Sequence, residues 1–250
     1  MNQPTDPSNP QSSSAEGAGI PPLPATPALP PDAGLGVILD TLLKRPVVLI
    51  RELCEGPGSR HWLLLALVAA LAFALYGLVI GSFSGGAQWM AAPLKVSAGG
   101  LVSALICLPS LYIFACLTGA EVSARGLAGV LFAMLTLTGL LLLGFAPVAW
   151  VFSQSTDSAA FIGTLHLVFW IIATGFGLRL FSHMTKVLRV ADPVHLKVWT
   201  VIFVLVCLQM TTALRPIIGT SEHWLPTEKR FFLSYWIENV FSATLQAPSR

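Results

Sequence analysis

Long apolar runs separated by short polar segments dominate the chain, and the clearest example is residues 101–152. This stretch reads LVSALICLPSLYIFACLTGA, then the polar EVSARG, then LAGVLFAMLTLTGLLLLGFAPVAWVF, and its charged residues are Glu121 and Arg125. A hydrocarbon core about 30 Å thick needs roughly 20 apolar residues in a helix. The pattern therefore predicts two membrane-spanning helices joined by a tight polar turn.

The same pattern predicts five spans in all, which together give an all-α polytopic membrane helix bundle. Their approximate bounds are residues 62–82, 101–120, 127–152, 159–181 and 198–217. Trp62, Trp150 and Trp199 fall at span ends, where the amphipathic indole prefers the membrane interface. We expect the transmembrane domain to occupy residues 57–217.

The segments that flank the spans differ from them in composition. Residues 1–34 are rich in Pro and Ser and should be disordered, because they contain few large apolar side chains. Residues 35–56 mix apolar and charged positions, and Pro46 suits the first position of a second helix. We expect two short amphipathic helices in the membrane interface; the alternative is a cytosolic helix packed on the spans. Residues 218–250 contain RFFLSYWIENVF, which predicts an amphipathic aromatic helix on the outer leaflet or over the mouth of the bundle.

Composition indicates an integral membrane protein. The 250 residues are 54% hydrophobic and 10% charged, whereas soluble domains carry about 25% charged residues. The net charge of +2 is too small to indicate nucleic-acid binding, and no basic patch with interleaved aromatic residues supports it. The four cysteines have no CxxC spacing, so we expect neither a disulfide framework nor a metal site, and no cofactor.

Lysine and arginine are distributed unevenly between the two sides of the predicted topology. With the N-terminus in the cytoplasm, nine of the 14 lie on the cytoplasmic side and five on the outer side. The nine are Lys44, Arg45, Arg51, Arg60, Arg125, Arg179, Lys186, Arg189 and Lys197, and the five are Lys95, Arg215, Lys229, Arg230 and Arg250. The positive-inside rule therefore predicts a cytoplasmic N-terminus and an external C-terminus in the cell (inner) membrane.

His166 and Gln209 are the strongest polar intrusions into the predicted spans. Each lies roughly 10 to 12 Å from the outer end of its span at 1.5 Å per residue, and the two helices are consecutive and antiparallel. We expect a hydrogen bond between them that stabilises packing by about 1 kcal/mol. The alternative is a ligand or ion site built on the pair, because ionisable groups inside membranes are often functional.

Proline also interrupts the apolar runs. Pro109 and Pro147 predict helix kinks that shape the bundle; the alternative is a cavity beside Ser110. Arg215 precedes Pro216, which should end the last span. We expect Arg215 to snorkel or to bind the freed carbonyls, and the alternative is a contact with an anion or a lipid headgroup.

Two further patterns predict contacts between helices. Glu121 and Arg125 have i, i+4 spacing at the cytoplasmic turn and should form an ion pair that fixes the hairpin; the alternative is a docking point for a partner. Small residues at fourfold spacing allow close helix approach and are compatible with a homo-oligomer. These are Ala115 with Gly119 and Ala173 with Gly177.

Several strings resemble a known family of membrane proteins. The interfacial LLKRPVVLIREL, followed by YGLVIGSFSGG, ICLPSLYIFACLTG and LRPIIG within five compact spans, resembles bacterial members of the Yip domain family. The resemblance covers about residues 36–217. Eukaryotic members interact with Rab GTPases, but their DLYGP-type string is not found here, so no GTPase partner is carried over. The resemblance implies a non-enzymatic membrane organiser or adaptor.

The motifs of catalysis are missing from the sequence: there is no nucleophile elbow, phosphate loop, HExxH or paired carboxylate. We therefore expect no enzyme, and a lipid-modifying activity ranks last. The first hypothesis is an integral membrane scaffold or adaptor that binds membrane or cytoplasmic proteins. The alternative is a small-solute permease or channel with a polar path near His166, Gln209 and Arg215.

Overall fold

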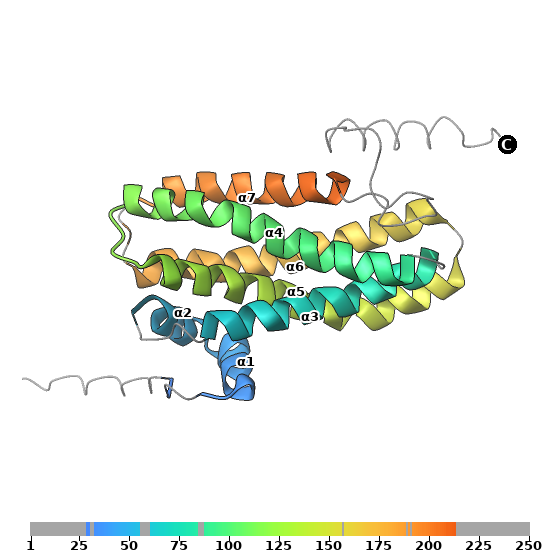
Figure 1. Cartoon of the computed structure of the whole chain (residues 1–250), viewed down its shortest axis with the longest axis horizontal. Helices are drawn as coiled ribbons and strands as arrows, with labels where there is room; N and C mark the ends of the chain where they lie inside the picture. Colours follow the sequence, from blue (N-terminus) through green and yellow to red (C-terminus); the bar gives the residue numbers. More distant parts are fainter. Residues whose placement is uncertain are drawn as a thin grey trace, which may run out of the picture.

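The computed structural model is all-helical over the residues that it describes, which confirms the predicted fold class. The structure describes residues 29–30, 33–55, 61–84, 88–156, 158–188, 190 and 192–213. Five helices in this part of the chain are long and apolar enough to cross a membrane. They run side by side along the long axis of the molecule (Figure 1). The chain is therefore a multi-pass membrane protein.

The helices follow one another with short connections. They are α1 (Leu35–Lys44), α2 (Pro46–Glu55), α3 (His61–Ser84), α4 (Gln88–Leu117), α5 (Ala124–Ser155), α6 (Ala159–Val187) and α7 (Val194–Ala213). Pro46 opens α2, as its fixed backbone geometry predicts. Most of the tail predicted at residues 1–34, and all of the tail predicted at residues 218–250, lie outside the described residues.

Helix α4 begins well before residue 101, where the sequence predicted its span to start. Its first residues are less apolar, and glycines at 99 and 100 weaken the helical signal further. The structure continues the helix through this region and packs it tightly on α3: a Cβ added at Gly77 would lie 2.6 Å from the Cα of Pro93. Lys95, counted above as part of an outer loop, is instead a buried residue of α4.

Two serine side chains and one glycine mark the ends of the central helices. Ser123 caps α5 by accepting a hydrogen bond from the Gly126 amide, and Ser158 caps α6 in the same way through the Phe161 amide. Gly119 follows α4 with φ +71°. The amide of Ala120 bonds the carbonyl of Ala115 at 3.3 Å, which closes a Schellman motif around Gly119.

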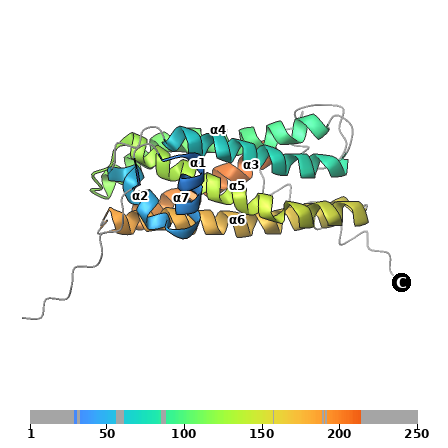
Figure 2. The ribbon, with the colours of Figure 1, turned by 90° about the horizontal axis from the view of Figure 1, so that it is seen from below.

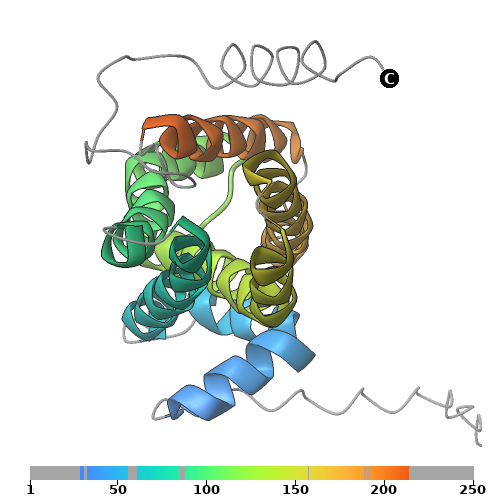
Figure 3. The ribbon, with the colours of Figure 1, turned by 90° about the vertical axis from the view of Figure 1, so that its right-hand side faces the viewer.

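Helix α5 is the centre of the bundle. In its apolar window 78% of the helix is buried, against 39% or less in the other four spans. Helices α3 and α6 pack on two sides of it, and α7 lies across the bundle from α1 and α2, next to α4 (Figure 3). Side-on, α3 and α4 form one edge of the molecule and α6 the other (Figure 2). Helices α2, α3, α4 and α6 thus pack around α5.

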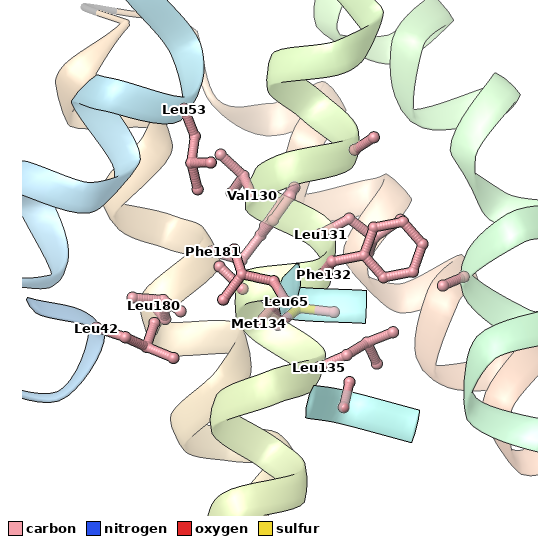
Figure 4. Close-up of a cluster of buried hydrophobic side chains, with 14 of the residues drawn as sticks. Leu42, Leu53, Leu65, Val130, Leu131, Phe132, Met134, Leu135, Leu180 and Phe181 are labelled. Carbon is pink, nitrogen blue, oxygen red and sulfur yellow. The ribbon is translucent and has the colours of Figure 1, made fainter. Parts of the chain in front are cut away.

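The α1–α2 elbow (residues 35–55) is docked on one end of this bundle. Its buried side chains include Leu42, Leu49 and Leu53, and α2 packs on both α5 and α6. Leu42 and Leu53 point into the apolar cluster that also contains Leu180 and Phe181 of α6 (Figure 4). The elbow therefore packs on the spans, as the alternative interpretation stated. Its position relative to the lipid stays a prediction.

Candidate functional site

A tyrosine and a histidine meet inside the half of the bundle that lies toward the α3–α4 and α5–α6 turns. The hydroxyl oxygen of Tyr76 on α3 lies 2.7 Å from Nδ1 of His166 on α6. The two rings meet edge to face, with centroids 5.5 Å apart and an interplanar angle of 82°. Tyr76 is 3% exposed and His166 is 6% exposed. Counted along their helices, both lie about 10 to 12 Å from the ends that face the α3–α4 and α5–α6 turns.

The hydrogen bond between Tyr76 and His166 joins α3 to α6, two helices that both pack on α5. Towards its C-terminal end α5 carries two small buried residues, Ala146 and Ala149. The other face of α5 carries the exposed Val148 and Val151. Because Tyr76 and His166 are themselves buried, the pair lies in the interior of the bundle.

The remaining nitrogen of His166 has no hydrogen-bond partner among the described residues. Its Nε2 atom is completely buried, and it is one of three such side-chain atoms in this part of the chain; the others are Nδ1 of His61 and Nδ1 of His195. A buried polar atom left without a partner costs about 1 to 3 kcal/mol relative to one that is hydrogen-bonded. Among the described residues, His166 therefore has a hydrogen-bond partner for Nδ1 but none for Nε2.

The partner that the structure gives His166 differs from the predicted Gln209. Gln209 is partly buried on α7, and α7 packs mainly on α4. The prediction assumed that consecutive helices would be close neighbours, whereas α3 and α6 both pack on α5, and Tyr76 of α3 lies within hydrogen-bond distance of His166. The signal that sequence reasoning missed was Tyr76 itself, since a tyrosine hydroxyl buried in an apolar span needs a partner.

Trp199 joins α7 to α4 and α6. Its Nε1–H lies 3.2 Å from both the Cys107 carbonyl and the Ser110 hydroxyl, and its ring packs on Phe181 with centroids 5.0 Å apart. Trp199 is completely buried, so the prediction that it anchors in the membrane interface is wrong. Trp199 lies more than one turn inside α7, which starts at Val194. There it contacts Cys107 of α4 and Phe181 of α6.

Two threonines of α5 connect it to its neighbours. Thr136 donates to the Leu65 carbonyl of α3 at 2.8 Å, and it also lies 2.8 Å from the Phe132 carbonyl of its own helix. Thr138 Oγ1 lies 3.0 Å from the Met134 carbonyl and 3.5 Å from the Ala173 carbonyl of α6. These hydroxyls are satisfied by backbone carbonyls and therefore serve packing.

The predicted ion pair between Glu121 and Arg125 does not form. Within the described residues the ion pair that the structure contains is Asp40 with Lys44 on α1. Glu121 precedes the cap residue Ser123 and so lies outside helix α5, where i, i+4 spacing no longer brings two side chains together. Both Glu121 and Arg125 are exposed at the turn.

Pro109 and Pro147 both lie inside helices that continue past them. Beside Pro109, the Ser110 hydroxyl donates to the Cys107 carbonyl at 2.8 Å and meets Trp199. Ser110 thus takes part in helix packing rather than in the lining of a cavity. Arg215 lies outside the described residues.

The predicted pairs of small residues have different outcomes. A Cβ at Gly177 would lie 3.1 Å from the Met134 carbonyl, so α5 and α6 do approach closely there. Gly119 lies beyond the end of α4 and has nothing within 4 Å of an added Cβ. It serves as a helix cap and not as a packing residue. In the described part of the chain, no three His, Cys, Asp or Glu residues are grouped so that they could hold a metal ion.

Comparison with models of protein families, with curated proteins and with solved structures finds no match for this chain. The resemblance to the Yip domain family stays a prediction.

Proposed function

We propose that the chain is a scaffold or adaptor of the Yip-like type in the cell (inner) membrane, where it organises partner proteins from its cytoplasmic face. The observation that carries the proposal is the docked α1–α2 elbow. It packs on the spans through one side and turns charged side chains to the other. Lys44, Arg45 and Arg51 are all exposed on it.

The contact between the elbow and α5 is close enough to hold the elbow in one orientation. A Cβ at Gly126 would lie 2.9 Å from the Leu53 carbonyl, and a Cβ at Gly129 would lie 2.9 Å from the Leu53 side chain. Larger residues at either glycine would push α2 away. A surface held in this way loses little conformational entropy when it binds a partner, which favours a docking role.

The polar contacts between the spans support the same function. Thr136 ties α3 to α5, and Trp199 ties α4 to α7. Contacts of this kind stabilise one arrangement of helices and use polar groups that a transport path would otherwise expose. A bundle with a fixed shape suits a protein that positions others.

Charge reversal on the elbow tests the adaptor proposal. A photo-crosslinker at the exposed residue 43 of the full-length protein identifies neighbours in native membranes, and the same experiment is repeated with Arg45→Glu and Arg51→Glu together. The expected result is loss of specific crosslinked partners in the double variant. Lys197→Glu is the matched control, because Lys197 is exposed on α7, across the bundle from the elbow (Figure 3). Crosslinks that are unchanged by the double reversal would contradict the proposal.

The orientation belongs to the same proposal and is tested separately. We propose a cytoplasmic N-terminus and an external C-terminus, supported by the excess of lysine and arginine on one side of the topology. Lys95 lies inside α4, and by the same criterion Arg125, Arg179, Lys186 and Lys197 lie inside α5, α6 and α7, so five against four remain in the elbow, the connecting segments and the tails. Reporter fusions at the two ends should give opposite compartments. The same compartment for both ends would exclude five spans.

A small-solute permease is the second candidate, and the buried Nε2 of His166 favours it. A histidine nitrogen that has no partner among the described residues of a bundle can contact a solute. Flux into proteoliposomes should then fall in His166→Leu and in Gln209→Leu. Absence of flux in the unmodified protein would leave the adaptor as the proposed function.

A further inference from the structure

The Tyr76–His166 pair contains a buried polar atom, Nε2 of His166, that helix packing does not explain. Packing is served by Thr136, Thr138 and Trp199, whose polar atoms all reach carbonyls or hydroxyls of other helices. His166 differs, because it offers a second polar atom, Nε2, that is buried and meets no described group. A phenylalanine at this position would fill the same space without a buried polar atom. Something outside the described residues therefore accounts for Nε2.

The tautomer of His166 follows from the hydrogen bond to Tyr76. Tyr76 is buried, and within the described residues its hydroxyl bonds His166 alone. If Nδ1 carried the hydrogen and donated to the phenol oxygen, the phenol hydrogen would lack an acceptor as well. If Tyr76 donates to Nδ1, one bond satisfies both groups and the hydrogen sits on Nε2. The atom that remains is then an N–H donor.

The surroundings decide what kind of molecule accepts from this donor. Towards its C-terminal end α5 carries Leu142, Ala146 and Ala149, which are apolar and buried. An anion among them would lose its hydration without a charged partner from α5. A neutral oxygen acceptor loses far less. Because Nε2 is completely buried, the acceptor must be small.

We propose that Tyr76 and His166 form a buried binding site for a small neutral hydrogen-bond acceptor, with His166 Nε2–H as the donor. Water is the smallest molecule of this class, and a small neutral solute with a carbonyl oxygen is the other source of the same chemistry. The site is independent of the adaptor role of the elbow. If the chain is a permease, this site is where a solute would exchange water for protein contacts in the half of the bundle that lies toward the α3–α4 and α5–α6 turns.

Nitrogen NMR of the full-length protein in liposomes tests the site directly. The protein carries ¹⁵N-labelled histidine, and the His166 signals are assigned by their loss in His166→Asn. The expected result has hydrogen on Nε2 and none on Nδ1, with magnetisation transfer from water to Nε2–H. Acetamide, added as a neutral carbonyl probe, distinguishes the two sources: transfer from water without an acetamide shift assigns the site to water, and a saturable shift assigns it to small amides.

Two results would overturn the proposal. One is a hydrogen on Nδ1 with Nε2 unprotonated, which reverses the role of the site from donor to acceptor. The other is a protonated Nε2 that receives nothing from water and does not respond to acetamide.

Tyr76→Phe separates the site from a merely structural contact. The ring remains, but Nδ1 loses its donor, so His166 should become a mixture of the two tautomers and its water transfer should weaken. Tyr112→Phe is the matched control, because Tyr112 is 43% exposed on α4 and should leave the His166 signals unchanged. If Tyr76→Phe fails to fold, the measurements on the unmodified protein still decide. An unchanged single tautomer in a folded Tyr76→Phe would contradict the assignment.

Discussion

Gly177 of α6 lies directly against Thr138 of α5. A Cβ added at Gly177 would collide with the Thr138 hydroxyl and would lie 3.1 Å from the Met134 carbonyl. Thr138 in turn lies 3.5 Å from the Ala173 carbonyl, one turn before Gly177. Gly177 therefore permits the close approach of α5 and α6 that places the Thr138 hydroxyl near carbonyls of both helices. The packing of these two helices depends on the absence of a side chain at Gly177.

Gly177→Ala should destabilise the protein for this reason. The new methyl group must displace Thr138 or the α5 backbone, and overpacking of this kind costs about 1 to 3 kcal/mol. Thermal unfolding in detergent measures the loss. Gly175→Ala is the control, since nothing lies within 4 Å of a Cβ there; it should be neutral or stabilising because alanine favours helix. Equal unfolding temperatures for the two variants would contradict the packing.

Trp199→Phe should lose one interhelical hydrogen bond and keep most of the apolar contact. After removal of the Nε1–H, the Ser110 hydroxyl still donates to the Cys107 carbonyl. The expected loss of unfolding free energy is therefore about 1 kcal/mol. Trp199→Ala also removes the contacts with Phe181 and Phe203 and should cost about 3 to 5 kcal/mol.

The matched control for Trp199 is Trp150→Phe, because Trp150 is 52% exposed. Tryptophan fluorescence gives an independent measurement: removal of Trp199 should take away emission that is shifted to short wavelength and protected from aqueous quenchers. A loss of stability in Trp150→Phe as large as that in Trp199→Phe would show that burial does not distinguish the two residues.

The number of spans could be predicted from the sequence because lipid requires about 20 apolar residues per helix, whatever the partners. The start of α4 could not, since Gly99, Gly100 and Lys95 weaken the apolar signal while the contact between Gly77 and Pro93 holds the helix in place. That contact comes from tertiary packing, which a single-helix pattern does not contain.

The candidate site was half predictable. His166 stood out because an imidazole inside an apolar span is costly, and its burial confirms that it lies inside the bundle. Its partner depended on which helices are neighbours. Chain order suggested α7, but the partner comes from α3, which packs on α5 as α6 does. Hydropathy alone does not encode this arrangement.

Gly119→Ala should destabilise the turn between α4 and α5. With φ at +71°, Gly119 has a backbone conformation that side chains disfavour, at a cost of about 1 kcal/mol. Gly119→Asn should cost less, because asparagine tolerates this region better. Gly144→Ala is the control inside α5, where nothing lies within 4 Å of an added Cβ. Unfolding in detergent measures all three, and a larger loss for asparagine than for alanine would exclude a backbone effect.

The Cys54 thiol of the elbow should be unreactive at neutral pH. Burial raises its pKa from 9.0 to about 12, and the neighbouring Glu55 carboxylate contributes in the same direction. Because the thiolate is the nucleophile, a rise of about three pH units lowers the reactive fraction about 1000-fold at neutral pH. Arg51→Cys, on the exposed side of the same helix, is the matched control. In each protein the cysteine to be labelled is kept and all other cysteines are replaced by serine.

Maleimide labelling between pH 7 and 9 should therefore modify Arg51→Cys rapidly and Cys54 at least about 100-fold more slowly. The same shift affects stability, because the folded protein holds the thiol proton more tightly than the unfolded chain does. The stability that the protonated Cys54 thiol contributes is complete below pH 9 and is lost as the pH rises toward 12. Cys54→Ser should reduce that alkaline loss of stability. Rapid labelling of Cys54 at pH 7 would mean that α2 leaves the bundle, and would contradict the docked elbow on which the adaptor proposal depends.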